Sequence, residues 1–363
     1  MPDLGDKLTN LRIKQIRPGL NEIYNNAKKN VEDKLSGFLN HFSKEFTKLK
    51  AELDAGTITE TEYRRKIISL LMRNDLMSRT RTIAKIMYAA NSEAIETINQ
   101  KIGAMIADGI SREAYQAEMD TGLDYQLFPL DANDVDEWMD ENPDIFPTQT
   151  IDKAKDERWN SKSITSSIVS DILIGVAVGI LAKRTADRIA NRNRNSMFTR
   201  AYDSLSGAYE YGRDIMIGEE ARKGMEPLKE WSATLDFKTR DAHRELDGKR
   251  VPEDQPFEVD GEEIWFPRDP TAPAHLRCNC RCAMRTIHTK YDTRNSRREN
   301  LRTYYPDGTW EKKVIPYMNY DEWYEMKRQQ MGDVEIQRQI KQMKREQQQR
   351  YYRKRKREKK NAS

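Results

Sequence analysis

The chain has 363 residues, of which 34% are charged and 37% hydrophobic, and its mean hydropathy is −0.91. This length permits two or three domains, but the composition leaves too little apolar material for one large core, so large parts must be exposed, elongated or covered by partners. The N-terminus, MPDLGDKLTN, lacks the basic and apolar regions of a secretory signal, so we expect synthesis and function to begin in the cytosol.

Residues 1–117 are predicted to form an elongated N-terminal helical region. Apolar residues recur at steps of three and four over residues 31–49, which predicts a single helix. Thr59 and Glu62 have the spacing of a capping box, which predicts the start of a second helix.

A third apolar stripe covers residues 83–105, and Gly109 is expected just past the end of its helix. The stripes of these helices are narrow, which suits a bundle, a partner's groove or an oligomer seam. The bundle alone explains them, so they do not by themselves indicate a partner.

The next segment is acidic. Residues 118–144 contain ten carboxylates, no Lys or Arg, and two prolines, Pro129 and Pro143. We interpret residues 118–161 as a Pro-containing acidic linker or docking strip.

Residues 162–224 are predicted to be a helical segment. Within it, residues 172–182 read ILIGVAVGILA, eleven uncharged residues. A helix of that length covers about 16 Å, too short for a hydrocarbon core of about 30 Å, so stable membrane insertion is not expected. The segment is predicted to be a buried core helix, with transient insertion in lipid as the alternative.

Residues 225–325 are predicted to be a small α+β domain. The sequence is dense in Gly and Pro there, and FEVDGEEIWF has the form of a hairpin about Asp260 and Gly261. The predicted fold class is therefore mainly α with one small α+β domain.

Three strings in this region, WSATLDFKTRDAHRELDGK, PRDPTAPAH and NCRCAM, resemble in order and spacing the phage Mu protein F-like family, the minor head or head-morphogenesis proteins of tailed phages. VIPYMNYDEW, residues 314–323, is similar to the family's ending in phages of Gram-positive hosts. The resemblance is sharp over about residues 230–325 and architectural over the preceding helices. Many members carry Cys-x-x-Cys where this chain has RDAH, which leaves His243 as the candidate ligand there.

The three cysteines of the chain lie within five positions of the string PAHLRCNCRCAM. In an extended strand alternate residues share a face, so Cys278, Cys280 and Cys282 would present three sulfurs on one side; to bind one metal ion, the strand would have to bend or a loop replace it. We hypothesise a structural zinc site of Cys280, Cys282 and His243, completed by Cys278 or His275. The alternatives are reduced cysteines packed as small apolar side chains, or a strained disulfide.

The same neighbourhood admits an enzymatic interpretation. His243 and three aspartates, Asp236, Asp241 and Asp247, lie within twelve residues and could hold a divalent metal for phosphodiester cleavage. Aspartates also favour turns, and the sequence contains no Gly-rich phosphate loop, G-x-S-x-G or H-E-x-x-H. We therefore predict that the chain is not an enzyme and keep a metal-dependent nuclease as the alternative.

Residues 326–363 form a basic, Gln-rich tail. Its last thirty residues carry twelve Lys or Arg against three Glu, interleaved with Tyr351 and Tyr352. Basic side chains neutralise phosphates and aromatic faces stack on bases, which predicts non-specific binding of double-stranded DNA; a solvated end that aids solubility is the alternative. The predicted DNA-binding residues are Lys344, Arg345, Arg350, Arg353, Lys354, Arg355, Lys356, Arg357, Lys359 and Lys360.

The resemblance implies a minor capsid protein that acts in head morphogenesis. Its expected partners are the portal protein, a scaffold or major capsid protein, and packaged DNA. The expected location is inside the capsid near the portal, after assembly in the host cytoplasm. Ejection with the DNA, with the apolar segment helping it across the envelope, is a further alternative.

Overall fold

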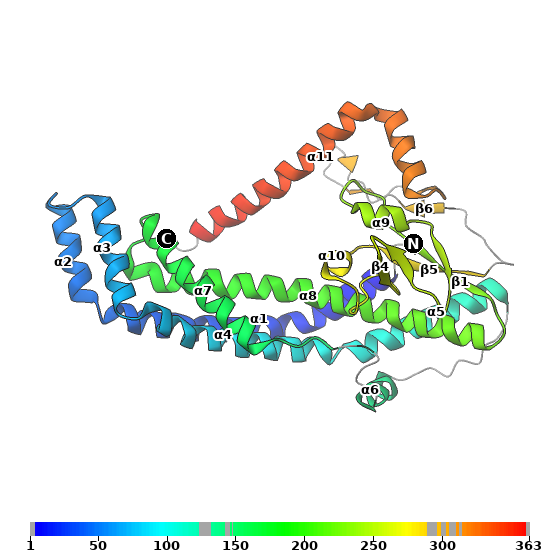
Figure 1. Ribbon diagram of the computed structural model, residues 1–363, viewed down its shortest axis with the longest axis horizontal. Coiled ribbons are helices and arrows are strands. Elements are labelled where there is room, and N and C mark those ends of the chain that lie inside the picture. Colours follow the sequence, from blue (N-terminus) through cyan, green and yellow to red (C-terminus); the bar gives the residue numbers. More distant parts are fainter. Residues whose placement is uncertain are drawn as a thin grey trace. The chain divides into compact units, whose positions relative to one another are not determined.

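The chain is mainly helical with small sheets of two or three strands, which confirms the predicted fold class (Figure 1). The computed structural model describes residues 4–122, 132–141, 146, 148–288, 296–298, 303–304, 310–311 and 314–360. The chain divides into two compact units. The helical unit comprises Asn10–Lys101 and Thr148–Tyr202, and the mixed unit comprises Met1–Thr9, Ile102–Pro147 and Asp203–Ser363.

Helices account for most of the described chain. Their bounds are α1 Leu4–Asn40, α2 Ser43–Asp54, α3 Glu60–Arg73, α4 Leu76–Asn99, α5 Ile102–Thr121, α6 Ala132–Glu141, α7 Lys153–Leu173, α8 Val178–Arg222, α9 Asp241–Leu246, α10 Ala274–Arg277 and α11 Tyr320–Lys360. The strands are β1 Pro227–Ser232, β2 Arg250–Pro252, β3 Phe257–Val259, β4 Glu262–Ile264, β5 Ala283–His288, β6 Ser296–Arg298, β7 Thr303–Tyr304, β8 Trp310–Glu311 and β9 Val314–Pro316.

The predicted single helix over residues 31–49 is wrong, because the stripe is divided between α1 and α2. The N–H of Phe42 donates to the carbonyl of Leu39 at 3.1 Å, a 3₁₀-type bond to the third preceding residue in place of the α-helical bond to the fourth. The Phe42 ring contacts those of Phe38 and Phe46, with centroids 5.3 and 6.3 Å apart. The chain therefore turns while its apolar stripe stays buried.

The capping box at the start of α3 is confirmed. The backbone N–H of Glu62 donates to the Thr59 hydroxyl at 3.2 Å, and the Glu62 carboxylate accepts from the Thr59 N–H at 2.8 Å. Two backbone donors that the helix leaves without partners are thereby satisfied.

The third predicted helix, over residues 83–105, is also two helices, because a turn separates α4 from α5. Gly109 lies inside α5 rather than past a helix end. A Cβ built on Gly109 would lie 2.2 Å from the carbonyl oxygen of Tyr209 in α8, and one on Gly212 would lie 2.1 Å from that of Ile106. Both glycines therefore permit the backbones of α5 and α8 to touch.

The predicted core helix over residues 172–182 is wrong, because these residues form the corner between α7 and α8. Gly175 has φ +82°, and the N–H of Val176 donates to the carbonyl of Asp171 at 2.9 Å, which closes the end of α7. Ile172 and Leu181 are buried, whereas Leu173, Ile174 and Ile180 are about half exposed. Within the described residues, no helix combines the length and apolarity needed to cross a membrane.

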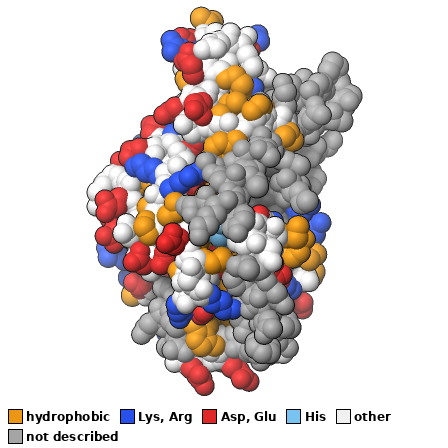
Figure 2. All heavy atoms as spheres, turned by 90° about the vertical axis from the view of Figure 1, so that its right-hand side faces the viewer, with side chains coloured by type: hydrophobic (Ala, Val, Ile, Leu, Met, Phe, Trp, Pro, Cys, Tyr) orange, Lys and Arg blue, Asp and Glu red, His pale blue; other side chains and the backbone are white. Residues whose placement is uncertain are grey.

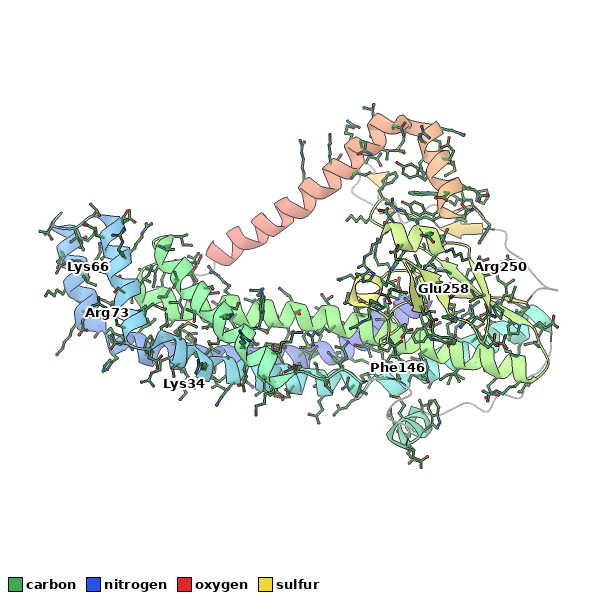
Figure 3. All side chains as sticks on the ribbon, in the orientation of Figure 1. Lys34, Lys66, Arg73, Phe146, Arg250 and Glu258 are labelled. Carbon is green, nitrogen blue, oxygen red and sulfur yellow. The ribbon has the colours of Figure 1, made fainter. Side chains whose placement is uncertain are left out.

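Apolar side chains and a few paired polar groups fill the core of the helical unit. The Tyr24 hydroxyl donates to Asn91 Oδ1 at 2.7 Å, and Asn91 Nδ2 donates to Asn193 Oδ1 at 3.1 Å. Charged side chains such as Lys34 and Lys66 project from its outer faces (Figure 3).

The mixed unit contains a three-stranded antiparallel sheet in the order β2-β1-β5. The β3–β4 hairpin is confirmed, and its two turn residues, Asp260 and Gly261, have φ of 55° and 77° as a tight primed turn requires. The rings of Trp231 and Phe257 meet edge to face at 5.3 Å. Basic and acidic side chains are interspersed over the described surface in the view of Figure 2.

The predicted acidic linker, residues 118–161, is described only in part. Residues 123–131, 142–145 and 147 lie outside the described residues, and α6 and the start of α7 lie within the described part. The side chain of Asp152 accepts from the N–H of Lys155 at 2.9 Å and so caps α7.

Candidate metal centre and basic helix

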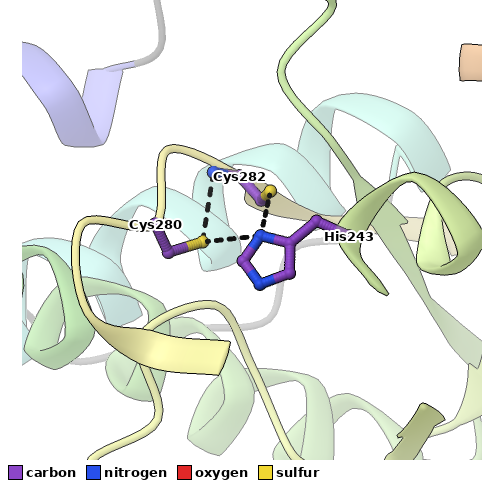
Figure 4. Close-up of side chains that lie close together, drawn as sticks. All are labelled: His243, Cys280 and Cys282. Carbon is purple, nitrogen blue, oxygen red and sulfur yellow. Dashed lines mark hydrogen bonds between the residues drawn. The ribbon is translucent and has the colours of Figure 1, made fainter. Parts of the chain in front are cut away.

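The short helix α9 and the loop between α10 and β5 bring three ligand-type side chains together (Figure 4). His243 and Leu246, three residues apart in α9, lie on one face and are both buried. Cys280 and Cys282 come from the loop and are each 2% exposed. The ring of Trp231 in β1 packs edge-on against the His243 ring at 5.6 Å.

The three ligand atoms form a tight group. His243 Nδ1 lies 3.3 Å from Cys282 Sγ and 3.7 Å from Cys280 Sγ, and all three atoms lie within 4.8 Å of one another. In the described part of the chain, this is the one group of three or more His, Cys, Asp or Glu ligand atoms that gathers so closely.

A backbone carbonyl orients the imidazole. His243 Nε2 lies 2.8 Å from the carbonyl oxygen of Leu276, which can only accept a hydrogen bond. Nε2 therefore carries the proton, and the lone pair of Nδ1 faces the two sulfurs. A histidine metal ligand is usually held in this way by an outer hydrogen bond.

The two thiols differ in acidity. Burial raises the pKa of Cys280, but the hydrogen bond with Cys282 and the charge of Arg268 act in the opposite direction, and this pKa lies well below its usual value. Burial and the neighbouring Cys280 raise the pKa of Cys282. The backbone N–H of Cys282 also donates to Cys280 Sγ at 3.4 Å. Cys280 is thus the thiol that is poised to be a thiolate.

Cys280 and Cys282 lie in a loop, the alternative to a bent strand, because β5 begins only at Ala283. Asn279 has φ 56°, in the left-handed region, and its N–H donates to both carboxylate oxygens of Asp203 at 3.1 and 3.0 Å. This turn separates Cys278 from Cys280 and Cys282. Asp203 precedes the loop by 76 residues, so no local sequence signal could have identified it.

Cys278 and His275, the proposed fourth ligands, are not in the group. His275 is exposed and Cys278 is half-buried. The Arg240 guanidinium donates to the backbone carbonyls of both residues and of Leu276. Arg240 therefore fixes the end of α10, a role that the sequence analysis did not assign to it.

The three nearby aspartates hold backbone groups or lie at the surface. Asp236 accepts from the N–H of Lys238 at 2.9 Å and pairs with Arg281. Asp247 accepts from the backbone N–H groups of Ala233 and Tyr320, each at 2.6 Å. The side chain of Asp241 is 97% exposed. None of the three carboxylates joins His243 in the metal-ligand group described above.

The basic tail continues a helix that is anchored in the mixed unit. Gly332 has φ 75° and ψ 158°, values that only glycine adopts readily, and it kinks α11. On either side of the kink, Trp323 and Ile336 are fully buried in one apolar cluster. The cluster consists of Leu235, Phe237, Ile315, Tyr320, Trp323 and Ile336, with Met318, Tyr324, Met326, Met331 and Ile340 packed against it.

All ten predicted DNA-binding residues belong to α11, after the kink. Arg345 is exposed, and the side chains of the other nine lie outside the described part of the structure. These nine are Lys344, Arg350, Arg353, Lys354, Arg355, Lys356, Arg357, Lys359 and Lys360.

Comparison with protein families concerns the segment that contains the candidate metal centre. Residues 162–285 match the Phage Mu protein F like protein family. The resemblance inferred from the sequence is thereby confirmed. The match begins inside α7 and covers α8, where the sequence alone indicated only an architectural likeness, and it ends at Arg285 within β5.

Two curated proteins are similar to this chain. Minor head protein GP7 of Bacillus phage SPP1 is 25% identical over 333 residues, which cover 89% of this chain and 91% of that protein. The NAD(+)–arginine ADP-ribosyltransferase EFV of Enterococcus faecalis is 35% identical over 107 residues, which cover 29% of this chain but only 20% of the transferase. No solved structure matches.

Proposed function

We propose that this chain is a minor head protein that acts in head morphogenesis of a tailed phage. The observation that carries the proposal is the alignment with the SPP1 minor head protein, which covers about nine-tenths of both chains. Similarity over nearly the whole of both chains indicates a shared arrangement of all their parts, whereas the transferase match covers a fifth of that enzyme.

We further propose that the chain joins the portal protein, with a scaffold or major capsid protein nearby, and lies inside the capsid after assembly in the host cytoplasm. The exposed apolar side chains at the α7–α8 corner support a partner-binding role, because covering apolar surface removes it from water and lowers the free energy. Ejection with the DNA remains part of the proposal.

The end of α11 is proposed to bind packaged DNA without sequence preference. Residues 342–363 carry ten Lys or Arg against two Glu. Ile336 is buried in the apolar cluster, which anchors α11 to the mixed unit. The basic residues after position 342 therefore belong to a helix that is packed at its base. Cations on such a helix neutralise phosphates and release counterions.

DNA binding is tested by deleting residues 342–363, which leaves Ile336 and Ile340 in their cluster. We expect the full chain to bind duplex DNA with an affinity that falls steeply with salt, and the truncated chain to lose most of it. A full-length variant with Gln347, Gln348 and Gln349 changed to Ala serves as the control and should bind normally. Equal binding by the truncated and full chains would contradict the DNA proposal.

Portal binding is tested separately by co-sedimentation of the chain with the portal protein of its phage at low and moderate salt. A complex that survives moderate salt, including with the truncated chain, supports the portal proposal. If the portal protein sediments alone under both conditions, that proposal is wrong, whatever the DNA result.

A further inference from the structure

We propose that His243, Cys280 and Cys282 bind a structural zinc ion through Nδ1 and the two Sγ atoms, without Cys278. Three observations carry this inference: the distances between the ligand atoms, the hydrogen bonds around them, and their burial. It is independent of the proposed role in head assembly.

The distances fit zinc geometry. With Zn–S near 2.3 Å and Zn–N near 2.0–2.1 Å in a tetrahedron, sulfur and nitrogen ligands lie about 3.6 Å apart. The distances from His243 Nδ1 to the sulfurs of Cys280 and Cys282 are 3.7 and 3.3 Å. Both distances lie within about 0.3 Å of the tetrahedral value.

The surrounding hydrogen bonds fit a metal site. The bond between His243 Nε2 and the Leu276 carbonyl presents Nδ1 as a bare lone pair, which a metal requires. The N–H of Cys282 points at Cys280 Sγ, where it stabilises a thiolate. Two soft sulfurs and one imidazole suit zinc better than magnesium or calcium, which prefer oxygen ligands.

Burial makes the proposed site structural. All three ligand residues are at most 3% exposed, so a substrate has no access to them. Three protein ligands leave the fourth tetrahedral position to a non-protein ligand such as water. The ion would link α9 to the loop before β5, segments joined otherwise by short strands and turns.

The test uses the full chain, purified without chelator, with metal content measured by mass spectrometry. We expect about one zinc per chain in the wild type. Cys280→Ser and Cys282→Ser should each lose it, whereas the neighbouring Cys278→Ser should retain it. Zinc well below one equivalent in the wild type, or loss of zinc in Cys278→Ser equal to that in Cys280→Ser, would overturn the proposal.

A second measurement avoids dependence on variants that fail to fold. Wild-type protein treated with a chelator should unfold at a lower temperature, and added zinc should restore the original midpoint, since metal bound only by the folded state stabilises it. Cobalt bound in place of zinc should give thiolate charge-transfer absorption that Cys278→Ser leaves unchanged. If neither chelator nor added zinc changes the unfolding temperature, the proposal of a structural metal is wrong.

Discussion

The helical unit buries apolar stripes that repeat every three or four residues, whereas the α+β part of the mixed unit, residues 225–325, combines an apolar cluster with buried polar groups that distant segments hold. In α1 and α3, Leu35 and Leu71 are at most 1% exposed. In the α+β part, buried groups such as His243 and Asp236 are held by partners far along the chain, and Asp247 accepts from a backbone group 73 residues away. Burial in a helix follows from the spacing of apolar residues along a short stretch of chain. The buried polar groups of the α+β part are satisfied only when segments far apart in the chain come together.

The largest effect is expected from an apolar truncation in the helical unit. Leu71→Ala removes a fully buried side chain from α3 and should lower the free energy of unfolding by about 2–5 kcal/mol, because a cavity remains. The adjacent Met72 is 45% exposed, so Met72→Ala serves as the matched control and should change stability by at most about 0.5 kcal/mol. Urea unfolding measures both. Equal losses would show that the stripe does not define the core.

In the α+β part, removing a carboxylate that binds backbone N–H groups should likewise lower the free energy of unfolding. Asp247→Ala leaves the N–H groups of Ala233 and Tyr320 without their carboxylate and should cost about 1–3 kcal/mol. Asp241→Ala removes an exposed aspartate six residues earlier and should change little. Thermal unfolding of the two variants compares them. A larger loss in Asp241→Ala would contradict the role given to Asp247.

The smallest expected effect is a change in how stability depends on pH, caused by the buried pair of His288 and Glu220. His288 Nε2 lies 2.9 Å from Glu220, and Asp120 lies 3.6 Å from Nδ1. Burial lowers the pKa of His288, but the hydrogen bond and charge of Glu220, with Glu113 and Asp120, raise it overall above its usual value. Burial raises the pKa of Glu220.

The raised pKa values of His288 and Glu220 both make the folded state less stable as pH rises. A raised His pKa stabilises the fold below about pH 6.5, and this contribution is lost as pH rises through the folded-state pKa. Ionisation of a carboxyl with a raised pKa also lowers stability as pH rises. The wild type should therefore lose more thermal stability between about pH 6 and pH 8 than His288→Gln does. If the unfolding temperatures of the wild type and His288→Gln fall equally between about pH 6 and pH 8, His288 and Glu220 do not cause the pH dependence.

Several features were predictable because their signals are local. The capping box of Thr59 and Glu62 and the hairpin turn at Asp260 and Gly261 each lie within four consecutive residues, and both are confirmed. The apolar stripes identified buried positions such as Leu35 correctly, since helical periodicity depends only on spacing along the chain.

The helix ends and the cysteine geometry depended on tertiary contacts. An apolar stripe continues across a turn when both helices face one core, so periodicity could not predict the breaks near Phe42, between α4 and α5, or at Gly175.

The candidate metal ligands were predicted in part from residue type. Which cysteines join His243 was decided by the left-handed Asn279, whose backbone N–H is held by Asp203 from a distant helix. The sequence by itself determined which side chains can bind metal and which face of helices such as α1 is buried, because both follow from residue type and spacing along the chain. Only the tertiary structure decided where the chain turns and which ligands meet, because those outcomes depend on hydrogen bonds between segments that are far apart in the chain.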